Sequence, residues 1–390
     1  MTKNKKNLIG LAVASTLAYP LAGQAVTWDA GDLQVNFHGS LRPSINWEEC
    51  DSPCRGPWVA PTTDSLPTEK KNSYMTSNFS HFQFDGSYKL TDTTSAVFKT
   101  EWKIDITESK TTVSPGDPTV QSTNTLVDFE QYLGLKGGLG MVRAGTILTP
   151  YMQSGVKLDP FRRDALAGRF FVDIYSALHH GTGFGRGRAT NTLRYDSPKF
   201  LGGLDLQAFY TLDESNNDNH GYGAGLMYDN KTFYAFLQYY DANRKGNSDA
   251  TKVGGKFRFG KTASLWAQYE SDGGLISLSE GIVAGVSPAG DLINYDTDNT
   301  VDGADLYVLG ADWNIGKFQI IGQYGERDDS TDSATGTTAQ NGHKGYLLGG
   351  AYRQTKQLYH YAGYLVKDFN TSIPDVDKNT RFTVGSTFTW

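Results

Sequence analysis

Residues 380–390 alternate between an apolar, aromatic-rich face and a polar face. The apolar face carries Phe382, Val384, Phe388 and the terminal Trp390. A period of two is typical of a β-strand with one apolar face. Chain ends are usually polar and frayed. An amphipathic strand whose last residue is tryptophan therefore indicates an apolar solvent, with an interface at which the indole ring can lie. A transmembrane β-barrel provides both.

The amino terminus indicates export. Lysines near the start precede an apolar stretch at residues 8–22, and small residues follow it up to Ala25. This pattern predicts a secretory signal peptide over residues 1–25. A membrane anchor is the alternative, but the stretch contains Pro20 and is shorter than the roughly 20 residues that span a bilayer. We therefore expect a mature chain of residues 26–390.

The composition narrows the class of protein further. Cleavage removes three of the 36 basic residues and none of the 42 acidic ones, so the mature chain has a formal charge of −9. This charge argues against nucleic acid as a partner. With 44 glycines and only 38% apolar residues, the chain is too polar for a bundle of membrane helices. No linker divides it, and a single large barrel fits because each strand needs an apolar residue only at alternate positions.

The two cysteines, Cys50 and Cys54, lie in a turn-rich sequence after the first predicted strand. Two cysteines this close in an exported chain predict one small disulfide. Metal binding is the alternative, but no histidine or second cysteine pair is near enough to complete a site. The glycine-rich run at 181–187 lacks the spacing of a dinucleotide-binding motif. We therefore predict no cofactor and no metal.

Period-two alternation recurs along the mature chain. Between residues 32 and 47, odd positions such as Phe37 and Trp47 form an outer face, while even positions form a polar face suited to a water-filled lumen. We predict an all-β fold, a 16-stranded antiparallel transmembrane β-barrel. Its strands are expected at residues 32–47, 81–90, 96–106, 126–136, 139–147, 188–196, 204–212, 222–228, 233–241, 252–259, 263–269, 306–315, 318–324, 346–352, 357–369 and 381–390.

The connections between these strands alternate in length. Tight turns such as 137–138 and 316–317 alternate with long polar segments such as 48–78 and 272–303. Short periplasmic turns and long outer loops are typical of an outer-membrane barrel. The protein is therefore predicted to lie in the outer membrane of a Gram-negative bacterium, with membrane lipid and lipopolysaccharide as neighbours.

One long connection, at about residues 148–187, differs from the others. It contains Phe161, Phe170, Ile174 and Tyr175 among its charged residues, so it is too apolar to remain in solvent. Long ordered loops are usually functional, and the inner wall of the barrel is the surface available for packing. We therefore predict a constriction loop that folds into the pore.

Four stretches of sequence carry a family resemblance. They are QYLGLKGGLG at 131–140, RAG at 143–145, NTLRYDSP at 191–198 and FTW at 388–390. In these stretches, taken in order, the chain resembles the Gram-negative porin family of trimeric sixteen-stranded diffusion channels. The resemblance implies a homotrimer in which each protomer has its own pore, narrowed by the third loop. It also implies that the terminal aromatic residue marks the chain for assembly.

Charged residues predicted to line the pore come from the wall and from the loop. By alternation, and because charge facing lipid is costly, the inward basic residues are Arg42, Lys99, Lys103, Arg143, Arg188, Arg194, Lys252, Lys256 and Arg258. The loop adds the cations Arg162, Arg163 and Arg169, besides Lys157 and Arg186, and the acids Asp159, Asp164 and Asp173.

The family resemblance implies acidic loop groups opposite a basic wall, but this chain departs from that pattern. Phe129 and Thr146 stand where the family commonly has arginines, and the loop itself carries five cations against three acids. A mildly basic constriction predicts a channel that favours anions.

Two other functions remain open. A substrate-specific outer-membrane channel differs from a general porin only in its pore lining. An outer-membrane barrel enzyme needs an oriented nucleophile and base, and the sequence has no Gly-x-Ser-x-Gly elbow. We predict a porin that is not an enzyme and that passes small hydrophilic solutes and ions passively. The acidic run at 296–305 resembles a calcium loop, but Leu309 stands where the bidentate glutamate belongs.

Overall fold

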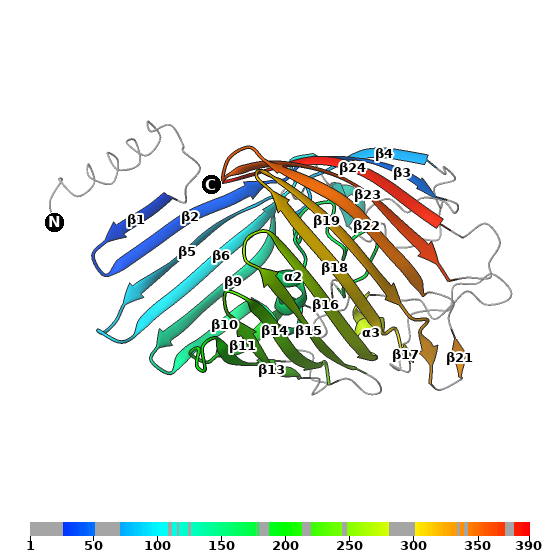
Figure 1. Ribbon diagram of the computed structural model, residues 1–390. Helices are drawn as coiled ribbons and strands as arrows, with labels where there is room; N and C mark the ends of the chain where they lie inside the picture. Colours follow the sequence, from blue (N-terminus) through cyan, green and yellow to red (C-terminus); the bar gives the residue numbers. More distant parts are fainter. Residues whose placement is uncertain are drawn as a thin grey trace.

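The computed structural model describes residues 26–50, 71–107, 111–114, 117–123, 126–176, 178, 187–212, 220–243, 248–280, 301–333, 336–338, 342–370 and 378–390. Sixteen antiparallel strand positions form a closed barrel (Figure 1), which confirms the predicted fold class. Within the described ranges, no helix is long and apolar enough to cross a membrane.

Two positions in the wall are each built from two consecutive strands. β2 (Leu33–Leu41) continues into β3 (Ser44–Cys50), and β4 (Lys71–Thr76) continues into β5 (His81–Lys89). The remaining positions are β6 (Ser95–Ile104), β9 (Leu126–Gly137), β10 (Gly140–Leu148), β11 (Arg188–Asp196), β12 (Leu204–Thr211), β13 (Gly221–Asp229), β14 (Phe233–Asp241), β15 (Asp249–Phe259), β16 (Ala263–Gly273), β18 (Leu306–Ile315), β19 (Phe318–Arg327), β22 (His343–Arg353), β23 (Leu358–Phe369) and β24 (Lys378–Thr389).

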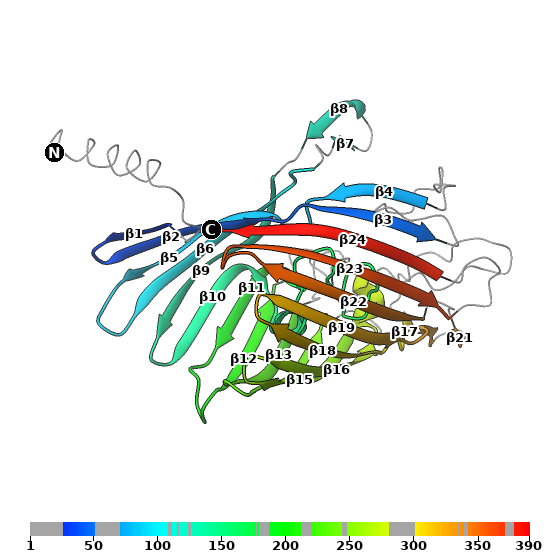
Figure 2. The same cartoon turned by 45° about the horizontal axis from the view of Figure 1, so that its top comes forward.

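Several short elements do not belong to the wall of the barrel. Strands β7 (Thr111–Ser114) and β8 (Asp117–Thr123) form a hairpin that stands clear of the lumen (Figure 2), within a segment that the sequence pattern predicts only as a loop. The others are β1 (Val26–Ala30), α2 (Pro150–Leu158), α3 (Leu275–Glu280), β17 (Val301–Asp302), β20 (Thr331–Asp332) and β21 (Thr337–Thr338).

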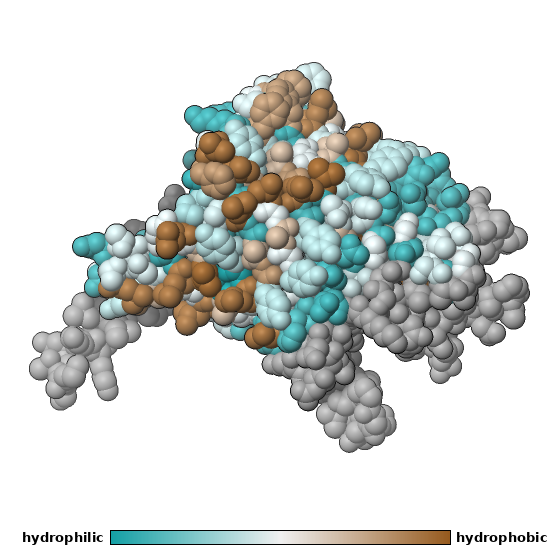
Figure 3. Space-filling view, turned by 90° about the horizontal axis from the view of Figure 1, so that it is seen from below, coloured by the Kyte–Doolittle hydropathy of each residue, from teal (hydrophilic) through white to brown (hydrophobic). Residues whose placement is uncertain are grey.

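The strands form because apolar and polar residues alternate on their two faces. On β16, Leu265 and Tyr269 are exposed on the outside, whereas Trp266 and Glu270 are buried on the lumen side. Figure 3 shows apolar side chains gathered on the outer surface. Tight turns join the strands at one end, and Gly316 occupies one of them with φ of +60°, a conformation that favours glycine.

The barrel closes between β24 and β2. Trp390 and Gly39 exchange two backbone hydrogen bonds of 3.2 Å, and the indole ring lies 6.2 Å from the ring of Phe37. A Cβ atom on Gly39 would lie 2.7 Å from the Trp390 ring, so this close approach requires glycine. Strand β1 pairs with the same edge of β2, beginning with Val26 opposite Phe37. The terminal residue therefore belongs to the closing seam.

Four predictions fall on residues outside the described ranges. These are the signal peptide at 1–25, the disulfide partner Cys54, the loop cation Arg186 and the first half of the acidic run at 296–305. Cys50 is the last residue of β3 and is buried. The cleavage site and the disulfide therefore stay predictions.

Candidate channel constriction

The constriction loop begins with a capped helix. The Thr149 side chain accepts a hydrogen bond of 3.3 Å from the backbone N–H of Met152, and Pro150 occupies the first turn of α2. Proline suits this position because its φ is already helical and the missing N–H would have no helical partner. After α2, the chain crosses the interior of the barrel before it returns to β11 (Figure 1).

Apolar side chains hold the loop against the inner wall. Phe161, Leu166, Ile174 and Tyr175 are buried in one cluster with wall residues that extend from Met227 on β13 to Leu365 on β23. The wall leaves room for them: a Cβ atom on Gly345 would clash with the Ile174 side chain. This packing confirms the inward-folded loop.

A buried ion pair fixes both arms of the loop. Lys252 and Glu270 lie 3.2 Å apart on adjacent wall strands, and neither is accessible to solvent. Tyr151 on α2 donates a hydrogen bond of 3.0 Å to Glu270, and Ser176 on the returning arm donates to the same carboxylate. A buried pair of this kind needs such additional hydrogen bonds to offset its desolvation. Lys252 therefore lies behind the loop and anchors it.

The three loop acids are all engaged in the loop or the wall. Asp159 accepts hydrogen bonds from the backbone of Phe161 and Gly168, at 3.0 and 2.9 Å, and burial raises the pKa of its carboxyl group. Asp164 binds Arg42 at 2.7 Å. It also accepts hydrogen bonds from the Tyr359 and Thr387 hydroxyl groups.

Asp173 lies 3.1 Å from Arg327 and 3.6 Å from Lys367. Burial acts to raise the pKa of this carboxyl group, but these two cations outweigh burial and hold the pKa below its ordinary value. All three loop acids therefore have hydrogen-bond or ion-pair partners within the protein.

The loop cations lie in three different surroundings. Arg163 reaches the opposite wall, where it donates to Glu101 at 3.1 Å and contacts His81 at 2.9 Å. Arg169 is 94% buried beside the rings of Phe79 and Phe170. Arg162 is exposed, and no described acid lies within ion-pair distance of it.

Apart from Lys252, the predicted basic residues of the wall fall into two groups. Four of them surround the loop cations: Arg42, Lys99, Lys103 and Arg188. The other group lies apart from the loop cations: Arg143 and Arg194 pair with Asp196, Lys256 donates to the carbonyl of Leu158 at 2.8 Å, and Arg258 pairs with Asp229 at 3.1 Å. Only the first group lies with Arg162, Arg163 and Arg169 at the constriction.

Sequence reasoning assigned neither the wall acids Glu101 and Glu130 nor the phenylalanines Phe79 and Phe129 to the lining of the pore. Glu101 and Glu130 lie 2.8 and 2.7 Å from the Lys99 ammonium group. A register shift between β6 and β9 places both Phe129 and Glu130 opposite Glu101, as in a β-bulge. Strict alternation turns only one of two consecutive residues inward, so the contacts of both inside the barrel could not be predicted. Glu101 could have been found, because it alternates in phase with Lys99 and Lys103.

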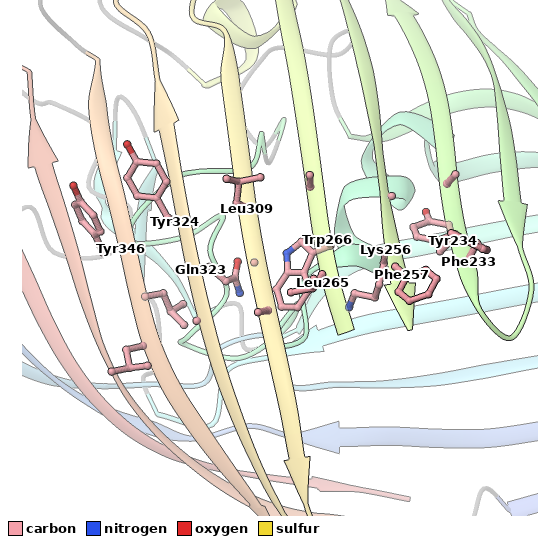
Figure 4. Close-up of a pocket in the computed structure, with 18 of the residues that line it drawn as sticks. Phe233, Tyr234, Lys256, Phe257, Leu265, Trp266, Leu309, Gln323, Tyr324 and Tyr346 are labelled. Atoms are coloured by element: carbon pink, nitrogen blue, oxygen red, sulfur yellow. The ribbon is translucent and has the colours of Figure 1, made fainter. Parts of the chain in front are cut away.

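A large groove lies elsewhere. It has a volume of about 1020 Å³ and crosses neighbouring strands from Phe233 on β14 to Tyr364 on β23, and Figure 4 shows the part from Phe233 to Tyr346. Its exposed lining residues, such as Leu309 and Leu348, belong to the outward faces of their strands. This groove therefore faces lipid and lies outside the path of solutes.

Comparisons of the sequence with known families and proteins agree with this architecture. The sequence model of the family described as Gram-negative porin matches residues 10–372. Major outer membrane protein P.IB of Neisseria sicca is 25% identical over 308 residues, which cover 73% of this chain and 75% of that protein. The protein of the same name from Neisseria gonorrhoeae is 29% identical over 132 residues, 32% of this chain and only 36% of that protein.

Solved structures resemble the fold. An anion-selective porin from Comamonas acidovorans superimposes with a TM-score of 0.64 at 16% identity, covering 92% of this chain and 100% of that one. OmpF of Salmonella typhi, in complex with daunomycin, gives 0.63 at 13% identity over 94% and 100% of the two chains. The trimer form of OmpT, an outer membrane protein of Vibrio cholerae, gives 0.57 at 14% identity over 92% and 100%. At these identities the likeness concerns the fold alone.

Proposed function

Because the chain belongs to the Gram-negative porin family, we propose that its barrel carries small hydrophilic solutes and ions passively through the outer membrane, with a mild preference for anions. The observation that carries the ion preference is the charge around the loop. Among the residues that the structure describes, seven cations meet there with four acids. The cations are Arg42, Lys99, Lys103, Arg162, Arg163, Arg169 and Arg188, and the acids are Glu101, Glu130, Asp159 and Asp164.

Local charge outweighs total charge in such a passage. A narrow channel with low-dielectric walls focuses the field of its lining residues. Charges on outer segments are screened over about 10 Å at ~0.1 M salt. The constriction cations therefore decide which ions pass, although the mature chain is acidic overall.

The protein is proposed to carry out no chemistry. The loop acids hold the loop in place through hydrogen bonds and ion pairs, which supports a structural role for them. A substrate-specific channel is the second candidate, and the phenylalanine side chains inside the barrel favour it.

The proposed assembly is a homotrimer in the outer membrane, surrounded by lipid and lipopolysaccharide, with residues 1–25 removed on export. Family membership supports this assembly, and one structure of the same fold is a trimer form. The outward apolar residues serve both subunit contact and lipid contact.

Replacing both Arg162 and Arg163 by Gln tests the proposed ion preference. We expect the zero-current potential in a KCl gradient to move toward cation preference by about 10 mV at low salt, with a smaller shift as salt rises. Reversal potentials of the purified protein in planar bilayers give the measurement. The matched control replaces Lys261 and Lys317, which lie on tight turns, by Gln. Equal shifts of the zero-current potential in the two double variants would show that the constriction arginines affect ion preference no more than lysines on the turns do.

A further inference from the structure

Three phenylalanine rings meet at the constriction. Phe79 precedes β5, Phe129 lies on β9 and Phe170 lies on the loop, so wall and loop both contribute. The Phe79 ring is 5.7 Å from that of Phe129 and stacks on that of Phe170 at 5.1 Å, with an interplanar angle of 16°. All three side chains are partly exposed. Hydrated inorganic ions gain nothing from such apolar surface.

Cations surround these rings. The Arg188 guanidinium carbon lies 3.3 Å from the centroid of Phe129, and that of Arg169 lies 5.1 Å from Phe170 and 5.9 Å from Phe79. The Lys103 ammonium group lies 4.9 Å from the Phe79 centroid. Ring faces attract cations, so these contacts hold the charged groups beside apolar surface. We call Phe79, Phe129, Phe170, Lys103, Arg169 and Arg188 the aromatic–cation cluster.

Two arginines of the cluster have unsatisfied hydrogen-bond donors. Nε and Nη1 of Arg169 and Nε of Arg188 are buried without a hydrogen-bond partner among the described residues. Burial lowers the pKa of Arg169 to about 9, and the charges of Arg163 and Arg188 act in the same direction while Asp159 opposes them. Because this value is above neutral pH, the guanidinium remains charged. Buried donors that lack an acceptor are costly, and an arriving anion would relieve that cost.

We propose that the aromatic–cation cluster is a binding site for aromatic carboxylates that pass through the constriction. The carboxylate accepts hydrogen bonds from Arg169 and Arg188, and the ring of the solute packs against the phenylalanine rings. A small inorganic anion interacts only with the cations, and a neutral aromatic molecule packs only against the rings. This inference rests on the proposed channel function and names a substrate class for it.

The two kinds of contact have measurable consequences. Aromatic packing adds a roughly three- to tenfold gain in affinity to the charge interaction, by the usual size of ring–ring contacts. A solute that binds in the narrowest part of a channel blocks other ions while it resides there. Benzoate is therefore expected to reduce chloride current at roughly three- to tenfold lower concentration than acetate, and benzyl alcohol is expected to have no effect in this range.

The experiment records chloride current through the purified full-length protein in planar bilayers while benzoate, acetate or benzyl alcohol is added. The test variants are Phe79→Leu and Phe129→Leu, which remove a ring but keep an apolar side chain. Each is expected to abolish most of the difference between benzoate and acetate. The control is Phe171→Leu, because Phe171 adjoins Phe170 in the chain but contacts Arg381 on the opposite side of the seam, at 4.2 Å. Arg169→Gln is expected to weaken the block by both carboxylates.

The possible outcomes distinguish failure of the aromatic-carboxylate site from failure of the proposed channel function. Equal block by benzoate and acetate in a conducting, anion-preferring channel would overturn the aromatic-carboxylate site and leave the porin function intact. Retention of the benzoate effect in both ring variants would likewise contradict the site. A protein that inserts but passes no current would overturn the channel function itself.

Discussion

Shortening the constriction loop between Ser154 and Ser176 is expected to raise single-channel conductance roughly two- to threefold. This segment includes Phe161, Leu166 and Ile174, which hold the loop across the interior of the barrel. Its removal widens the passage but leaves all wall strands and their ladder hydrogen bonds intact. Loop deletions of this kind are tolerated when the strands are untouched. Single-channel recording and the size limit of uncharged sugars in liposome swelling measure the effect.

The matched control for this deletion shortens the hairpin of β7 and β8. That hairpin stands clear of the lumen (Figure 2), so its loss should leave conductance unchanged. An unaltered conductance after the loop deletion, in a barrel that still resists heat and detergent, would mean that residues 154–176 do not narrow the pore.

Deleting residues 388–390 is expected to lower the yield of assembled barrel roughly tenfold, because the cut leaves the end of β2 without its partner at the seam and removes the terminal aromatic rings. The deletion removes the backbone pairing of Trp390 with Gly39 and of Phe388 with Leu41. Trp390→Phe should cost much less, since it keeps the backbone pairing and a ring beside Phe37. The measurement is the yield of heat-resistant oligomer in outer-membrane fractions. Parent-like yield from the deletion variant would refute the role of the seam.

Much of the fold could be predicted because one physical rule operates all along the wall. Each strand exposes alternate residues to lipid and lumen. The alternation of apolar and polar residues around Trp47 and Leu265 therefore predicts that both side chains face outward. The inward turn of the loop could be predicted for a related reason. Its apolar residues, Phe161 and Tyr175 among them, need a surface that only the inner wall provides.

The details of the constriction depend on contacts between residues far apart in sequence. Alternation places Arg42 inward, but only the folded loop shows that it pairs with Asp164. Likewise, Arg162 and Arg163 are neighbours with the same charge, yet one is exposed and the other reaches Glu101. The register shift on β9 has no sequence signal of its own, so the inner contacts of both Phe129 and Glu130 appear only in the structure.

Reversal-potential recording of the unaltered protein tests the central claim most directly. The purified protein would be inserted in a planar bilayer under a tenfold KCl gradient at low salt, where screening is weakest. A water-filled pore with a basic constriction predicts stepwise ohmic currents and a zero-current potential of the sign that indicates chloride preference. Insertion without conductance, or a zero-current potential that indicates potassium preference, would contradict the account.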